Sequence, residues 1–204
     1  MKIKQQNINK SLLILLSLSF FVRAVLAMIV EFGNDEVYYW TYAMYPDWSH
    51  FDHPPMVGWI IQIFSCNLLF DSEFFLRLSS VIFMTINTYL VFLIGRQVKN
   101  EQTGFYAALL YTASIYAFVI TGIFILPDTP LSIFTLLAVL QFVKYFQYEK
   151  NKHLLLAGLF TGLAMLSKYS GVFVWVGVGL YVIIYARKEF KNPLLYLSAL
   201  ISVV

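Results

Sequence analysis

Long apolar runs constrain this chain more than any other feature. A transmembrane α-helix needs about 20 consecutive, mainly apolar residues. Hydrophobic residues make up 60% of the chain and charged residues 12%, whereas soluble domains carry about 25% charged residues. The sequence therefore predicts an all-α polytopic membrane protein, with residues 1–204 forming a single transmembrane domain. The predicted spans cover residues 11–30, 74–98, 104–126, 130–148, 154–166, 172–186 and, incompletely, 193–204.

A polar interval at residues 31–73 interrupts these runs. It holds seven of the eleven carboxylates and two of the three histidines. The aromatic residues between 38 and 45 suit a helix lying in the headgroup layer. The apolar residues 56–70 are enough to lie on or dip into the membrane surface but are few for a span. We expect an outer catalytic loop that contains interfacial helices.

The charges orient the predicted spans. Cytoplasmic loops of membrane proteins carry an excess of lysine and arginine. With the N-terminus inside, the outer segments hold only Arg77 and Lys168, and Arg23 lies within the first span. The other eleven of the fourteen basic residues fall inside: Lys2, Lys4, Lys10, Arg96, Lys99, Lys144, Lys150, Lys152, Arg187, Lys188 and Lys191. Because this positive charge is spread over short loops, we expect no nucleic-acid partner.

The first span has an alternative interpretation. Its basic start, and residues 25–27 (Val-Leu-Ala), loosely resemble a signal peptide with its cleavage site. Arg23 is expensive within a span unless it snorkels to the headgroups or pairs with Glu31 or Asp35. At the other end, residues 194–204 are too few to span a membrane, so we expect the chain to be the N-terminal part of a longer protein.

Asp35 and Glu36 are the first candidate site residues. They follow the first span closely, so we expect them at the outer membrane surface. Partial desolvation there raises the pKa of a carboxyl and strengthens the carboxylate as a base. Adjacent residues do not share one helix face, which indicates different roles: one takes a proton, and the other holds a substrate or a metal. A solvated acidic loop edge is the alternative.

Asp52 and His53 precede two prolines that fix the backbone before residues 56–70. A histidine there can bind phosphate when protonated or a metal when neutral, and a satisfied loop histidine is the alternative. Asp128 interrupts two apolar runs and could cap the fourth predicted span. Lys168 is predicted to lie on the outer side, where most of the carboxylates also lie. A lone lysine there indicates either an anionic ligand or an ion pair with one of these carboxylates.

Four motifs in order resemble a known family. They are Asp-Glu-Val-Tyr-Tyr-Trp at 35–40, Phe-Asp-His-Pro-Pro-Met-Val at 51–57, Pro-Asp-Thr-Pro-Leu at 127–131, and Gly-Leu-Ala-Met-Leu-Ser-Lys-Tyr at 162–169. Together they resemble the GT-C glycosyltransferases, and more narrowly the bacterial glycosyltransferase family 39 group. That group is related to protein O-mannosyltransferases and to the aminoarabinose transferase that modifies lipid A. The resemblance implies a GT-C-type transmembrane helix bundle.

The resemblance also implies a reaction. Such enzymes move a sugar from a polyprenyl-phosphate carrier to an acceptor hydroxyl of a lipid, glycan or protein, on the outer face of the bacterial inner membrane. The hydroxyl attacks the anomeric carbon, usually with inversion, and the lipid phosphate leaves. By position, Asp35 corresponds to the base, Glu36 to its supporting neighbour, and Asp128 to the acid of the second outer loop.

One position departs from the family pattern. His53 stands, after Asp52, where the aminoarabinose transferases carry a lysine that contacts the carrier phosphate. Lys168 could supply the missing permanent charge, and together these residues form a predicted phosphate-binding set with Asp52 and Asp128. A divalent metal cofactor held by Asp35, Glu36, Asp52 and His53 is a further hypothesis.

Two other function classes compete with the enzyme. In a transporter or channel, carboxylates within the membrane would line a pathway, but here the acids cluster in the outer loops. A non-enzymatic, lipid-binding membrane protein is the second alternative. Labelled lipid-linked sugars would discriminate both from a transferase.

Overall fold

The computed structural model describes residues 5–203, which leaves Lys2, Lys4 and Val204 outside the description. The chain is 81% helical, with no strand in the described range. This confirms the predicted fold class, an all-α membrane helix bundle. In chain order the elements are α1 (Gln5–Ile29), α2 (Asn34–Met44), α3 (Met56–Phe64), α4 (Glu73–Val98), α5 (Glu101–Ala113), the π-helix η1 (Tyr116–Ile120), α6 (Thr121–Ile123), α7 (Asp128–Tyr148), α8 (Asn151–Ser167), the 3-10 helix η2 (Tyr169–Val172), α9 (Phe173–Tyr185), the 3-10 helix η3 (Arg187–Lys191) and α10 (Pro193–Ile201).

Among the described residues, three helices are long and apolar enough to cross a membrane, namely α1, α4 and α7, and the bent pair of α5 with η1 and α6 would make a fourth if it is one span. Only 22% of the most apolar window of α1 is buried, and large apolar side chains such as Leu13, Leu18 and Phe21 are exposed on it. An exposed apolar face is expected where lipid replaces water as the solvent. The remaining predicted span ranges are also helical, but α8 and α9 are shorter, and the division into seven spans stays a prediction.

The predicted span 104–126 is broken. Helix α5 ends at Ala113, and the chain resumes as η1 and α6 at an angle of 72°. Neither Pro nor Gly stands at the break, which falls at Ser114-Ile115. The Ser114 hydroxyl accepts a hydrogen bond from the Ala117 amide at 3.2 Å, which satisfies one of the amides at the start of the new segment. The π-helical turn that follows is a feature often found at functional sites.

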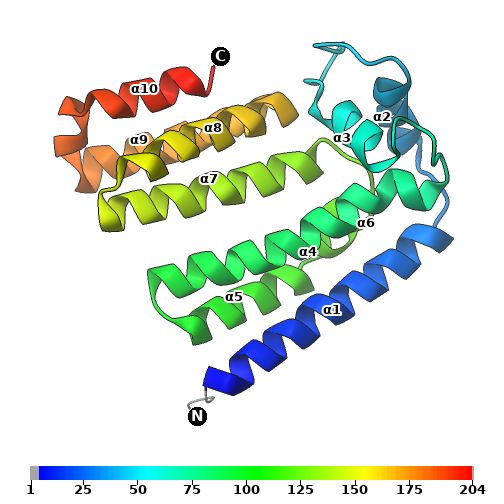
Figure 1. The fold of residues 1–204 in the computed structure, drawn as a ribbon, viewed down its shortest axis with the longest axis horizontal. Coiled ribbons are helices and arrows are strands. Elements are labelled where there is room, and N and C mark those ends of the chain that lie inside the picture. The colour runs from blue at the N-terminus through cyan, green and yellow to red at the C-terminus, as the bar shows by residue number, and fades with distance from the viewer. Residues whose placement is uncertain (1–4, 204) are drawn as a thin grey trace.

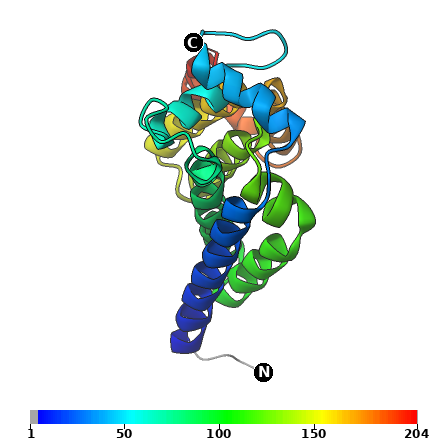
Figure 2. The same cartoon turned by 90° about the vertical axis from the view of Figure 1, so that its right-hand side faces the viewer.

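The polar residues 31–72 form one end of the bundle, which we call the acidic end. Figures 1 and 2 show α2 and α3 together at this end, opposite the start of α1. The cluster that seats them contains Tyr42, Val57, Ile61, Leu76 and Ile125. It joins α2 and α3 to α4 and to the α6–α7 connection, so the loop is part of the packed structure. Two short helices thus form where interfacial helices are predicted.

Small residues bring α8 and α10 together. A Cβ atom added to Gly158 would overlap the backbone carbonyl of Ser198, and one added to Gly162 would lie 3.0 Å from Ser202 Cα. The Ser198 hydroxyl donates a hydrogen bond to the Leu154 carbonyl at 2.7 Å. Gly158 and Gly162 have the small-xxx-small spacing, and in this structure it allows close helix packing.

Candidate active site at the acidic end

Asp35 and Glu36, at the start of α2, face different surroundings. Gly33 precedes this helix, and its amide donates a hydrogen bond to Glu36 Oε2 at 3.0 Å, which turns the Glu36 side chain back toward the helix start. Glu36 is 2% exposed, whereas Asp35 is exposed. The two carboxylates thus have separate environments, as expected for neighbours on a helix.

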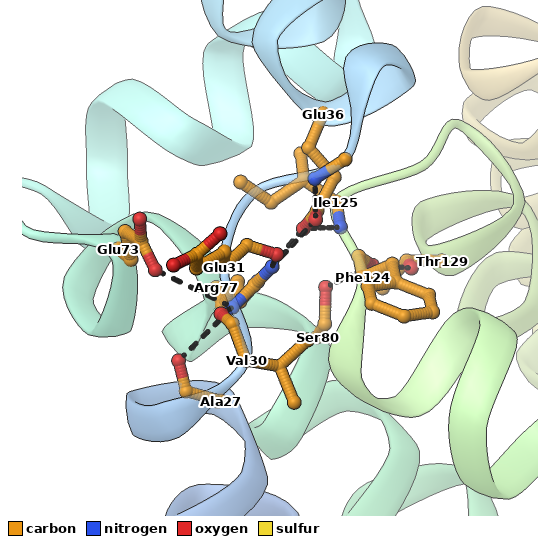
Figure 3. Close-up of polar contacts among 11 residues, drawn as sticks. Ala27, Val30, Glu31, Glu36, Glu73, Arg77, Ser80, Phe124, Ile125 and Thr129 are labelled. Carbon is orange, nitrogen blue, oxygen red and sulfur yellow. Dashed lines mark hydrogen bonds and ion pairs between the residues drawn. The ribbon is translucent and has the colours of Figure 1, made fainter.

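A buried ion pair holds Glu36. Arg77, in the first turns of α4, donates from Nε to Glu36 Oε1 at 2.8 Å and from Nη2 to Oε2 at 2.6 Å. The Ile125 amide donates to Oε1 at 3.0 Å, so both carboxylate oxygens accept two hydrogen bonds. Figure 3 shows the α6–α7 connection meeting α2 and α4 at this carboxylate. Glu36 therefore ties three parts of the chain together.

The same arginine closes the end of α1. Its guanidinium donates to the carbonyls of Ala27 and Val30 and, at 3.0 Å, to that of Glu31. The last carbonyls of a helix lack partners within the helix and need donors from outside it. Arg77 supplies these donors, which makes the end of α1 part of the folded site. We call Glu36, Arg77 and these carbonyls the Glu36–Arg77 junction.

Asp35 lines a cavity of 480 Å³ beside the junction, together with Gly33, Asn34, Glu36, Ile120, Phe124 and Leu126. Its carboxylate has no ion-pair partner among the described residues. A base has to be free to accept a proton. Of the two neighbouring acids, only Asp35 meets this condition, because the Glu36 oxygens are engaged.

Asp52 is held by two tyrosines of α2. Tyr42 donates to Asp52 Oδ1 at 2.5 Å and Tyr38 donates to the same oxygen at 2.8 Å. The other oxygen lies 3.1 Å from His53 Nδ1. The hydrogen bond from Tyr42, with those from Tyr38 and His53, lowers the pKa of Asp52 to about 2. A carboxylate that stays ionised so readily is a weak base, so it is better suited to orient His53.

His50 also has a partner in this group. Its ring stacks on that of Tyr42, with the ring centroids 3.6 Å apart. Burial lowers the pKa of His50 and raises that of Tyr42. At physiological pH the His50 imidazole and the Tyr42 phenol are therefore both neutral where their rings stack. His50 therefore helps to place the tyrosine that holds Asp52.

Asp128, the first residue of α7, pairs with Lys168, which lies between α8 and η2. Lys168 Nζ lies 2.9 and 3.1 Å from the two Asp128 oxygens, and Tyr116 donates to Asp128 Oδ1 at 2.8 Å. The expectation that Asp128 caps the helix is wrong, since Pro127 occupies the cap position and no side chain caps the helix. Of the two interpretations of Lys168, the structure shows the ion pair.

Tyr39 shows that three of the acids share one region. Burial, together with the negative charges of Asp52, Asp35 and Asp128, raises the pKa of Tyr39 to about 12. These carboxylates come from α2, from the loop before α3 and from α7. The Tyr39 phenol therefore stays protonated among them and can donate a hydrogen bond. Asp35, Asp52, Asp128 and their partners form the candidate active site.

The described residues contain no group of three or more histidine, cysteine, aspartate or glutamate side chains that could hold a metal ion. Glu36 is one of the four residues of the metal hypothesis, but both of its oxygens already accept hydrogen bonds from Arg77 and from backbone amides. The remaining acids Asp35 and Asp52 lie around Tyr39. A bound metal would therefore need ligands from the substrate or from water.

Sequence reasoning missed the partners of these acids. Arg77 is counted with the outer segments, but it falls at the outer end of the predicted span 74–98, where an arginine needs a partner. Tyr38 and Tyr42 are spaced four apart and so share one helix face, but nothing in the sequence links them to Asp52. The expected pairing of Arg23 with Glu31 or Asp35 is wrong: its guanidinium nitrogens have no hydrogen-bond partner in the described range, and it is fully buried rather than snorkelling.

The fold and the site define a class: a polytopic membrane protein with a carboxylate-rich, aromatic-lined site at one end of its helix bundle. Residues 52–204 match the family described as dolichyl-phosphate-mannose-protein mannosyltransferase. The chain belongs to this family, which confirms the predicted relationship. The match includes Asp52, His53, Asp128 and Lys168, while Asp35 and Glu36 precede it.

The chain also resembles an individual curated protein. The chain is 28% identical over 148 residues to the lipid A galacturonosyltransferase RgtD of Rhizobium johnstonii, and the aligned part covers 72% of this chain and 31% of that protein. The chain thus spans about a third of the length of the relative. No solved structure matches the chain.

Proposed function

We propose that this chain carries the catalytic end of a membrane glycosyltransferase. In this proposal a sugar moves from a polyprenyl-phosphate carrier to an acceptor hydroxyl on the outer face of the bacterial inner membrane. Asp35 takes the proton of the hydroxyl as it attacks the anomeric carbon, and the carrier phosphate leaves. The family supports sugar transfer in general, and the donor, the acceptor and the side of the membrane belong to the proposal.

The observation that carries the proposal is the contrast between Asp35 and Glu36. Asp35 is exposed to a 480 Å³ cavity and free of ion pairs, while the Glu36–Arg77 junction fixes the backbone next to it. General base catalysis requires a positioned base within reach of the proton it removes. A rigid helix start that presents one free carboxylate to a cavity meets that requirement.

An apolar groove supports a lipid-linked donor. A cavity of 770 Å³ lies along α7 and α9, lined by residues from Leu131 and Ser170 near the acidic end to Gln147 and Tyr181 at the other end. No charged residue lines it. The groove begins near the Asp128–Lys168 pair, since Leu131 follows Asp128 by one turn and Ser170 follows Lys168 by two residues. A lipid chain in it would place its head at the acidic end.

The test uses radiolabelled polyprenyl-phosphate sugars and the purified protein in lipid nanodiscs, with transfer to lipid A, glycan or peptide acceptors measured. We expect Asp35→Asn to lower transfer by about 10²–10⁴-fold, the usual contribution of a general base. Asp71→Asn is the matched control, because Asp71 is an exposed carboxylate of the same loop, and it should leave transfer unchanged. Equal turnover in Asp35→Asn and wild type would disprove the assignment of the base.

Metal dependence is a separate part of the proposal. A divalent ion shared by Asp52, the substrate phosphate and water would neutralise the leaving group and leave Asp35 free to act as the base. Exhaustive chelation should then abolish transfer, and added Mg²⁺ or Mn²⁺ should restore it. If transfer survives chelation, the protein cations alone neutralise the phosphate.

A further inference from the structure

Arg23 is a fully buried guanidinium without a partner. It lies in α1, six residues before the helix ends at Ile29, so it sits about 9 Å below the acidic end at 1.5 Å per residue. Its side chain is 0% exposed, and in the described part of the chain none of its three nitrogens makes a hydrogen bond. Burying an unpaired charge among apolar residues is among the costliest arrangements in a protein. Such a residue indicates a function.

The other basic residues near the acidic end are already neutralised. Arg77 is paired with Glu36 and Lys168 with Asp128. Among the described residues, Arg23 is thus the arginine or lysine of this half of the bundle whose charge no carboxylate neutralises, so it can still pair with an anionic ligand. A group with negative charge that reaches this depth would meet a guanidinium with all its donors free.

The neighbours of Arg23 form a shaped site for its guanidinium. The Phe118 ring lies under the guanidinium, 4.8 Å from centroid to Cζ. A Cβ atom on Gly122 would lie only 2.8 Å from Arg23 Nε, so glycine at this position makes room for the side chain. Tyr111 is close enough to interact electrostatically with the Arg23 guanidinium. These neighbours supply no carboxylate.

From these contacts we infer that Arg23 is the receptor for the phosphate group of a membrane-embedded lipid. Planar guanidinium matches phosphate oxygens through paired N–H donors. A phosphate on a lipid chain is the anion that can reach this depth, since its apolar tail stays in the membrane. If the proposed function is correct, the polyprenyl-phosphate carrier is the source; otherwise a bulk phospholipid with the same chemistry is.

The bent segment contacts both Arg23 and the cavity of Asp35. Phe118 and Gly122, which cover Arg23, belong to the bent segment Tyr116–Ile123. Ile120 of the same segment lines the cavity of Asp35. One helical segment therefore contacts both the guanidinium and the cavity, and the inference requires a shift of that segment that opens the guanidinium to the cavity. The phosphate of a donor and the base would then face one space.

The test measures lipid binding by the protein in nanodiscs of uncharged lipid, using farnesyl phosphate, farnesol and dioleoyl phosphatidate as probes. Wild type should prefer farnesyl phosphate to farnesol. Arg23→Gln should lower the affinity for farnesyl phosphate by about 10- to 100-fold, the range for hydrogen bonds to a charged group, and leave farnesol binding unchanged. Equal losses with phosphatidate would support the phosphate site and identify bulk lipid as its source.

Arg96→Gln is the matched control, because Arg96 also lies over a phenylalanine, Phe92, but at the opposite end of α4. It should bind all probes as wild type does. Because an unpaired buried charge disfavours folding, Arg23→Gln and the volume-conserving Arg23→Met should fold at least as well as wild type. Unfolding of both variants would show a structural role and overturn the inference, as would unchanged phosphate preference in either.

Sugar transfer distinguishes this inference from the proposed function. If wild type and Arg23→Gln transfer sugar with the same KM for the donor, the inference fails and the proposed function stands. If wild type transfers no sugar while Arg23 still governs binding of lipid phosphate, the site stands and the proposed function fails.

Discussion

The Glu36–Arg77 junction yields a quantitative prediction about stability. Glu36→Gln keeps the shape of the side chain but replaces one oxygen by an amide that donates. Each Glu36 oxygen accepts two hydrogen bonds, Oε1 from Arg77 Nε and Ile125, and Oε2 from Arg77 Nη2 and Gly33. Either orientation of the amide therefore faces two donors. Breaking one partner of a buried ion pair costs about 3–5 kcal/mol of the free energy of unfolding.

Arg77→Met should be at least as costly, because it leaves Glu36 charged and three α1 and loop carbonyls without a donor. The double variant should cost less than the sum of the two single changes. Residues in one buried network couple by about 0.5–3 kcal/mol, and the paired geometry places this junction at the upper end of that range. The assay is reversible unfolding in mixed micelles, followed by circular dichroism.

Glu73→Gln is the control for the junction. Glu73 Oε2 also faces Arg77, but at 3.9 Å and with its side chain 44% exposed. Exposed pairs contribute about 0–1 kcal/mol, so this variant should unfold almost like wild type. Additive single costs at Glu36 and Arg77, within about 0.5 kcal/mol, would refute the junction, as would a loss in Glu73→Gln equal to that in Glu36→Gln.

Three further predictions follow from single contacts. Hydrogen bonds from Tyr42 and Tyr38 lower the pKa of Asp52 in the folded protein. The stabilisation that they give is therefore complete above the unfolded pKa of 3.8 and is lost as the pH falls through about 2. Tyr42→Phe should raise the pKa of Asp52, which carboxyl NMR titration measures. Gly158→Ala should destabilise the α8–α10 contact by about 1–3 kcal/mol, while Gly179→Ala, where a Cβ meets nothing within 4 Å, should be neutral or stabilising. Asp128→Asn should leave Lys168 without its counterion, weakening sugar transfer, and Asp128→Asn with Lys168→Met should be more stable than Asp128→Asn alone in thermal unfolding.

The helices were predictable from the sequence because apolar runs of membrane length have few alternatives. Every predicted span range contains helix, although the range 104–126 is broken, and the described residues contain no strand. Alternating direction of the spans predicts that residues 31–73, Asp128 and Lys168 share one end, and the ion pair of Lys168 with Asp128 confirms this for those two residues. What hydropathy determines is which residues share an end of the bundle.

The roles of neighbouring residues were not predictable in the same way. Asp35 and Glu36 carry the same charge and adjoin in sequence, yet one is exposed and the other is 2% exposed. The difference arises from Arg77, which lies 41 residues further on. The break at Ser114-Ile115 was missed because it uses neither proline nor glycine, and the contacts of the chain around it decide where the helix bends.

The bent segment Tyr116–Ile123, rather than the polar residues of the acidic end, positions the groups of the site. Tyr116 holds Asp128, which in turn binds Lys168. The connection that follows supplies the Ile125 amide to Glu36, and Thr129 returns a hydrogen bond from its hydroxyl to the Thr121 carbonyl at 3.0 Å. A straight helix over residues 104–126 would direct these groups along one axis and could not reach both acids. The break therefore lets the bent segment and the connection after it hold Asp128 at the start of α7 and Glu36 of α2, and a change in its bend would move both together.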